Sequence, residues 1–158
     1  MKGLIFINNY WRDSQRNMGR ELRDIGPAPF AANLERITQM NPNFRTAIWT
    51  GKYLQLTVMS LKAGESIGFE MHPDLDQLLY IVSGNGLVRM GTRRDVMSVT
   101  ERLGEGFAFI VPAGTWHNLT NTGRRPLKLF SVYAPPQHPR GTVHVTKAES
   151  DAAEAYDH

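Results

Sequence analysis

The stretch Gly64-Glu-Ser-Ile-Gly-Phe-Glu70-Met-His72-Pro-Asp-Leu-Asp-Gln77-Leu-Leu-Tyr-Ile-Val-Ser-Gly84 carries the side chains that decide the interpretation of this chain. A second informative stretch follows it in the sequence: Gly106-Phe-Ala-Phe-Ile-Val-Pro112-Ala-Gly114-Thr-Trp-His117-Asn-Leu-Thr-Asn121. Side chains two positions apart on a strand share a face, so Glu70 and His72 are predicted to point the same way. A turn at Pro-Ala-Gly would deliver His117 from a separate hairpin. The two stretches therefore predict convergence of polar groups inside a small barrel.

The segment from Thr46 to Tyr133 alternates short runs of β-branched and aromatic residues with Gly, Pro and Asn. The tetrapeptide Ser83-Gly84-Asn85-Gly86 predicts a tight hairpin turn. Many short strands at close spacing indicate a sandwich or barrel rather than a parallel α/β sheet, so the predicted fold class is all-β. The predicted strands cover residues 53–61, 77–82, 87–90, 97–102, 107–111 and 127–133.

The length of 158 residues predicts one domain, with a barrel core at about residues 50–135. An N-terminal preface, residues 1–49, precedes this core, and a C-terminal arm and helix, residues 136–158, follow it. In the preface, apolar residues spaced by three predict a short helix that ends at Asn41-Pro42. Near the C-terminus, Thr142–Val145 predicts a late strand, and Thr146-Lys-Ala-Glu149 is a capping box that predicts a helix reaching about residue 156.

The composition of the chain excludes some kinds of chemistry and makes some kinds of partner unexpected. There is no cysteine, which excludes disulfides, thiolate metal sites and cysteine nucleophiles. The net charge is +3, and the arginines do not form one basic run interleaved with aromatics, so we expect no nucleic-acid partner. The apolar run Leu4–Ile7 is too short for a signal sequence, and no stretch approaches a membrane span. We therefore expect a cytoplasmic protein without a membrane partner.

Together the two motifs resemble those of the cupin superfamily. The first motif of that family reads Gly, five residues, His-x-His, three or four residues, Glu, six residues, Gly. The second reads Gly, five residues, Pro-x-Gly, two residues, His, three residues, Asn. Both spacings are met here. Two ligand positions depart from the pattern: Glu70 stands where the first His is expected, and Gln77 where the Glu is expected. The resemblance implies a double-stranded β-helix (jelly-roll) barrel, and it implies a homodimer.

The variant motifs, with the tail Tyr133-Ala-Pro-Pro and Gly141-Thr-Val-His-Val-Thr-Lys, look like those of small bacterial single-domain cupins often labelled mannose-6-phosphate isomerase-like. That label is an analogy at the level of the fold. A phosphosugar also needs a cationic clamp, and the sequence has no compact Arg/Lys motif to supply one.

The resemblance implies a metal shell of Glu70, His72, Gln77 and His117. The shell keeps one carboxylate, which has moved from the usual position to Glu70, and an unpaired buried carboxylate would be costly. Two imidazoles and a carboxylate suit an open site for a divalent metal: Mn, Fe, Ni, Co or Zn. The alternative is structural: Gln77 bonded to backbone, Glu70 paired with an Arg, and two ordinary hydrogen-bonded histidines.

Further candidates are less specific. Tyr133, His138 and His144 can supply a general acid or base, although a docked surface arm explains them as well. Arg45, before the first predicted strand, can bind an anion or form a structural salt bridge, and the salt bridge is favoured.

Three functions follow from these residues. The first is a metal-dependent enzyme that acts on a small oxygenated molecule, either isomerase-like or oxygenase-like. The second is a non-catalytic, metal-dependent binder of a small molecule such as a carbohydrate. The third is a structural cupin without metal.

Overall fold

The computed structural model describes residues 22–156. Residues 1–21 of the predicted preface, with the apolar run Leu4–Ile7, and residues 157–158 lie outside the described part. The helices are α2 Leu34–Met40 and α3 Lys147–Tyr156. The strands are β1 Arg45–Thr50, β2 Gln55–Leu61, β3 Asp76–Ser83, β4 Gly86–Gly91, β5 Val99–Leu103, β6 Ala108–Val111, β7 Trp116–Asn121, β8 Leu127–Ala134 and β9 Val143–His144.

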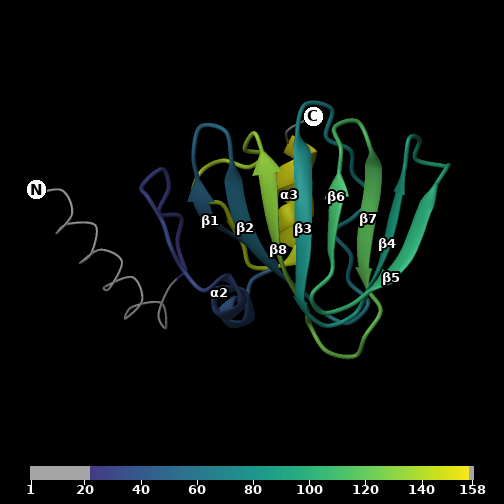
Figure 1. The fold of residues 1–158 in the computed structure, drawn as a ribbon, viewed down its shortest axis with the longest axis horizontal. Helices are drawn as coiled ribbons and strands as arrows, with labels where there is room; N and C mark the ends of the chain where they lie inside the picture. The colour runs from purple at the N-terminus through teal and green to yellow at the C-terminus, as the bar shows by residue number, and fades with distance from the viewer. Residues whose placement is uncertain (1–21, 157–158) are drawn as a thin grey trace, which may run out of the picture.

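Two antiparallel sheets form the fold (Figure 1). The larger has the strand order β6-β3-β8-β2-β1-β9, and the smaller has the order β5-β4-β7. Chain neighbours such as β3 and β4 lie in different sheets, which is the crossing pattern of a jelly roll. The predicted all-β class and jelly-roll architecture are confirmed.

The core lies between the two sheets. In β8 every second side chain is buried, from Leu127 to Tyr133, because successive side chains of a strand point to opposite faces. Leu79 of β3 packs in the same cluster as Val88 of β4 and Leu119 of β7, so the cluster joins both sheets. Burial of one such aliphatic side chain contributes about 1.5–3 kcal/mol.

Helix α2 covers the outer face of the larger sheet. It begins after Asn33, whose side chain accepts a hydrogen bond from the N–H of Arg36, and it ends at Met40 before Asn41-Pro42, as the sequence predicts. Ile37 of α2 is fully buried against Ile48 and the neighbouring strands.

The sequence prediction misses two strands, β1 and β7. β1 includes residues assigned to the preface, and its first four residues are all buried, so it shows no alternation. β7 alternates, but its residues WHNLTN are mostly polar and resemble a turn region. In both strands tertiary contacts prevail over the local pattern.

The C-terminal arm closes the inner side of the larger sheet near its β1 edge. β9 pairs with β1 as predicted for a late strand, and α3 follows it. Arg45 points to the inner face, because it lies opposite the core residue Met59, and it bonds Ser150 of α3. Figure 1 accordingly shows α3 behind the larger sheet. Within residues 22–156, neither helix is long and apolar enough to cross a membrane.

Candidate metal centre

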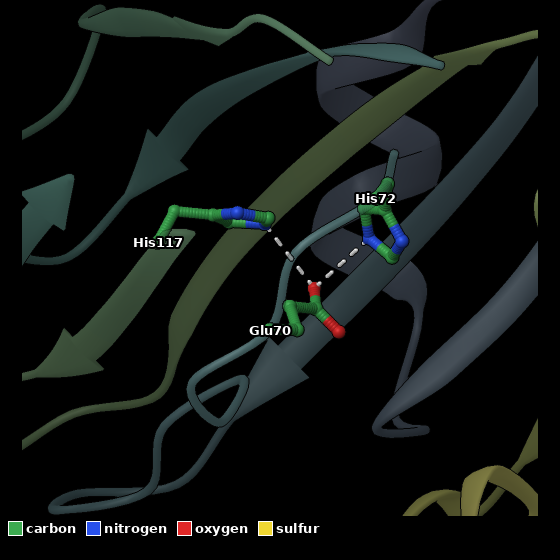
Figure 2. A group of neighbouring side chains, drawn as sticks. All are labelled: Glu70, His72 and His117. Atoms are coloured by element: carbon green, nitrogen blue, oxygen red, sulfur yellow. Dashed lines mark ion pairs between the residues drawn. The ribbon is translucent and has the colours of Figure 1, made fainter. Parts of the chain in front are cut away.

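Glu70, His72 and His117 converge as the sequence predicts. The Oε1 atom of Glu70 lies 3.5 Å from Nε2 of His72 and 3.4 Å from Nε2 of His117. Figure 2 shows the carboxylate between the two imidazole rings, whose centroids are 5.6 Å apart. His117 is fully buried, whereas the side chains of Glu70 and His72 are 15% and 11% exposed. The cluster therefore lies inside the barrel and opens toward Glu70 and His72.

The backbone that carries Glu70 is not the continuous strand that the sequence predicts. Gly68 has φ of +92°, which breaks the extended run. Instead, Glu70 and His117 form an isolated bridge in which each backbone N–H donates to the other residue's carbonyl, at 3.1 and 2.9 Å. This reciprocal pair holds the two side chains in register.

The loop before His117 is tied to the loop after His72. The N–H of Gly114 donates to the carbonyl of His72 at 2.8 Å, and the N–H of Ala113 donates to Oδ1 of Asp76 at 2.9 Å. Gly114 has φ of +80°, a conformation that favours glycine. The predicted Pro-Ala-Gly turn thus fixes both histidines relative to each other.

The tautomer of His117 follows from its other ring nitrogen. Nδ1 lies 3.1 Å from the carbonyl oxygen of Thr115, and a carbonyl only accepts, so Nδ1 carries the hydrogen. In the neutral ring, Nε2 then presents a lone pair toward the carboxylate of Glu70. Within residues 22–156, Nε2 of His117 and Nε2 of His72 are both buried and have no hydrogen-bond partner. Each faces the Glu70 carboxylate, so either a proton or a metal ion between nitrogen and oxygen removes the cost of burying these atoms unpaired.

The spacing of the donor atoms fits one ion. Donors bound at about 2.1 Å to a common metal lie roughly 3.0 to 3.4 Å apart at octahedral or tetrahedral angles. The two distances from Oε1 of Glu70 are 3.4 and 3.5 Å, and all the donor atoms lie within 4.8 Å of one another. The residues present therefore fit a divalent metal.

The amide oxygen of Gln77 is unpaired. The Nε2 atom of Gln77 donates to Oγ of Ser131 at 2.8 Å, and Oε1 is buried and has no partner among residues 22–156. Gln77 pairs with Tyr133 across the sheet, and the ring of Tyr133 lies 6.0 Å from that of His72. The free amide oxygen is therefore on the inner face, beside a neighbour of the metal cluster.

The carboxyl of Glu70 is held in its ionised form. Burial raises its pKa, but in the metal-free protein hydrogen bonds and positive charge from protonated rings, His117 first and His72 second, lower it by more, and the net pKa lies below its ordinary value. An ionised carboxylate is the form that binds a metal.

Three further candidates form a row that leads away from the cluster. The ring of Tyr133 lies 5.3 Å from that of His138, which lies 6.2 Å from that of His144. Nε2 of His138 is 3.4 Å from the hydroxyl of Tyr133. Burial raises the pKa of Tyr133, and burial first and Arg45 second lower the pKa of His138 to about 3. Tyr133 therefore stays protonated at neutral pH, and His138 stays neutral.

Gln55 was not predicted as a site residue, yet it fixes this row. It is fully buried, its Oε1 accepts from the N–H groups of Gln137 and His138, and its Nε2 donates to the carbonyl of His138 at 2.8 Å. The arm at His138 is thus bonded into the barrel. Strand parity with Thr57 and Met59 is the only signal in the sequence that would have placed Gln55 inward.

A separate surface groove of about 700 Å³ lies at the other end of the barrel. It includes Ser83 at the end of β3 and Lys128 near the start of β8, whereas Gln77 and Tyr133 lie at the opposite ends of these strands. None of the candidate metal ligands lines it.

Fold and site together define a small β-sandwich protein with a buried histidine and carboxylate cluster. The Cupin domain family (Cupin_2) matches residues 57–133, the stretch that carries all four candidate ligands. The chain belongs to the cupin superfamily.

The chain is also similar in sequence or structure to particular proteins. The Bacillus subtilis protein YrkC is 52% identical over 143 residues, which cover 90% of this chain and 77% of YrkC. The crystal structure of BH2720 from Bacillus halodurans is 55% identical, covers 82% of this chain and 98% of its own, and superimposes with a TM-score of 0.81. An RmlC-like cupin from Shewanella frigidimarina, 19% identical over 60% of this chain and 77% of its own, shares the fold with a TM-score of 0.52. That the protein forms a homodimer remains a prediction.

Proposed function

We propose that this cupin binds a divalent metal through Glu70, His72, His117 and Gln77 and acts with it on a small oxygenated molecule. The observation that carries the proposal is the state of His117. Its Nδ1 donates to a carbonyl, and its buried Nε2 faces the carboxylate of Glu70 without a partner. A metal ion accepts both lone pairs and removes the cost of leaving them unpaired.

The donor set points to a first-row metal. Two imidazoles, one carboxylate and one amide oxygen suit Mn, Fe, Co or Ni with positions left open for a ligand, and Zn competes because its affinity is higher than that of Mn or Fe. A bound ion of this kind would act as a Lewis acid on a carbonyl or hydroxyl oxygen. Two protein groups near the cluster would then serve the ligand: the phenol of Tyr133 can donate a hydrogen bond, and the neutral ring of His138 can accept one.

An isomerase-like reaction has less support than an oxygenase-like one. Proton shuttling is fastest when the acid or base has a pKa near the working pH. The pKa of His138 lies at about 3, and that of Tyr133 is raised above its ordinary value of 10. Neither of these two groups is matched to proton transfer at pH 7, and burial lowers the pKa of the third candidate, His144, from its ordinary value.

The same observation favours a second candidate, a non-catalytic metal-dependent binder of a small molecule such as a carbohydrate. Such a protein needs the metal and the hydrogen-bonding groups but no matched acid and base. Turnover separates the two functions, so the metal-loaded protein should be screened for oxygen uptake and for sugar isomerisation.

The first experiment is elemental analysis of protein purified without chelators or nickel resin. Wild type is expected to hold close to one metal per chain, and His117→Ala and Glu70→Gln are expected to lose it. Glu101→Gln is the matched control, because it makes the same chemical change on an exposed position of β5. Absence of metal in wild type after reconstitution with Mn, Fe, Ni and Zn would overturn the proposal.

A further inference from the structure

Arg45 is a buried cation with incomplete pairing. Its side chain is 1% exposed, and Nη1 lies 2.6 Å from Oγ of Ser150 and 3.3 Å from Nδ1 of His144. Arginine only donates, so Nδ1 of His144 accepts. Arg45 also hydrogen-bonds Tyr133, and its guanidinium carbon lies 5.5 Å from the centre of the Phe44 ring. Within residues 22–156, the carboxylate that pairs with it is Glu154, at 3.9 Å and 40% exposed, and the buried Nε atom of Arg45 has no hydrogen-bond partner.

This pairing is weak for a buried charge. A buried guanidinium normally has a bidentate carboxylate or a full set of acceptors, because an unpaired buried charge is costly. A partly exposed carboxylate at 3.9 Å contributes at most about 1 kcal/mol. The salt-bridge role that the sequence favours for Arg45 is therefore present but weak, and among residues 22–156 the guanidinium keeps an unused donor at Nε.

Arg45 and the metal cluster share the same polar interior. Tyr133 and His138 are close to both: the charges of Arg45 and Glu70 act on the pKa of each. The ring of Tyr133 is 6.0 Å from that of His72, and the row from Tyr133 through His138 and His144 ends at Arg45. A small ligand at Tyr133 would therefore lie near both the metal cluster and the guanidinium.

A second observation also points to a ligand. Two more inward-facing polar atoms here are buried and have no partner in the described part of the chain: Oγ1 of Thr57 and Oε1 of Gln77. Thr57 pairs with Ser131 on β8, two positions before Tyr133. Buried polar atoms are nearly always satisfied, so several unsatisfied ones in one interior indicate a polar molecule that completes them.

The charges indicate the net charge of that molecule. With the proposed divalent metal bound, its charge and that of the Glu70 carboxylate would sum to +1, and the charges of Arg45 and Glu154 cancel. His138 is neutral at pH 7 because burial lowers its pKa to about 3. The interior thus balances one negative charge.

We propose that Arg45 binds the carboxylate of a small hydroxy- or oxo-monocarboxylate whose second oxygen reaches the metal. This inference rests on the proposed metal site and names the class of molecule that the site takes. Glu154, which is half-buried, competes with the ligand for Arg45.

The test is calorimetric titration of manganese-loaded protein with sodium glycolate, with neutral glycolamide and with inorganic phosphate. Glycolate is expected to bind at least about tenfold more tightly than glycolamide, because a charged hydrogen-bonded pair is worth about 1.5–3 kcal/mol. It is also expected to bind more tightly than phosphate. Equal affinity for glycolate and glycolamide, or a preference for phosphate, would overturn the inference.

Two variants locate the effect. Arg45→Gln is expected to keep its metal and to weaken glycolate binding about tenfold or more. Glu154→Gln removes the competing carboxylate from a half-buried position and is expected to tighten glycolate binding up to about fivefold. If Arg45 only serves the fold, Glu154→Gln leaves glycolate affinity unchanged or lower, and that result alone overturns the inference even where Arg45→Gln fails to fold.

Metal content keeps this inference separate from the proposed function. A protein that binds manganese but does not prefer glycolate supports the metal site and refutes the role of Arg45. A protein without metal that still binds glycolate through Arg45 refutes the proposed function and leaves the anion site standing.

Discussion

The two ends of the barrel interior differ sharply, although the same strands build both. At one end the inward positions of β2, β8 and β3 carry aliphatic side chains; at the other they carry mainly amides, hydroxyls and a phenol. The register pairs Met59 with Leu129 at the apolar end and Gln55 with Tyr133 at the polar end. The apolar set is Met59, Leu61, Ile81, Leu127 and Leu129, and the polar set is Gln55, Thr57, Gln77, Ser131 and Tyr133.

This contrast shows how a small domain divides stability from function. The apolar end buries side chains that have no hydrogen-bonding needs, so each contributes to the free energy of folding. The polar end buries atoms that stay unsatisfied, among them Oγ1 of Thr57 and Oε1 of Gln77, and each costs about 1–3 kcal/mol. Functional sites commonly carry such a cost, which a bound ion or ligand removes.

The largest expected effect falls on the apolar end. Leu129→Ala removes a fully buried side chain from the centre of the core and is expected to lower the free energy of unfolding by about 2–5 kcal/mol. Urea denaturation of the metal-free protein measures this change, and metal content should not change. A loss below about 1 kcal/mol would mean that the apolar end is not the main source of stability.

Metal removal is expected to act only through the polar end. At a manganese concentration 100 times the dissociation constant, wild type should gain about 2.7 kcal/mol of stability over the metal-free form. His117→Ala should gain none, because it lacks one of the buried nitrogen donors. Thermal unfolding with and without manganese measures the difference, and an equal gain in both proteins would place the ion elsewhere.

Acid is expected to lower the stability of the folded protein through His138, at the polar end of the barrel interior. Its pKa falls from 6.5 in the unfolded chain to about 3 in the folded protein, so its stabilising effect is complete above pH 6.5 and is lost as the pH falls. The metal-free protein should lose about 2 kcal/mol between pH 6.5 and about pH 4.5 on this account. Arg45, Glu70, His72 and His144 surround this ring. His138→Gln should show a flatter profile in denaturation across that range, and an unchanged slope would assign the loss to another group.

The smallest expected effect comes from Ser131→Ala. The change removes the acceptor that orients Gln77 and should cost about 1 kcal/mol of stability, because one hydrogen bond is lost and one amide N–H is left unpaired. It should also weaken metal binding several-fold. The metal-loaded variant should still bind glycolate more tightly than glycolamide. Ser131→Thr keeps the hydroxyl and serves as the matched control. Full metal affinity in Ser131→Ala would mean that Gln77 is not a ligand.

Much of the fold and the heart of the site can be predicted from the sequence. Period-two alternation marks β8, glycine and proline mark the turns, and the spacing of Glu70, His72 and His117 predicts their convergence. The strand β1 could not be found in this way, because both of its faces are covered and the alternation disappears. Gln55 could not be found either, since its role depends on the arm at His138, 83 residues away.

The sequence by itself determined the class of fold and the kinds of donor atom, because alternation and turn chemistry are local and ligand chemistry belongs to the residue type. Only the tertiary structure decided which buried atoms have partners. Whether Nε2 of His117 carries a hydrogen depends on the carbonyl of Thr115, and the pairing of Arg45 depends on Ser150, 105 residues away. Hydrogen bonding is short-ranged and directional, so the unsatisfied atoms that define the site exist only after distant segments have packed.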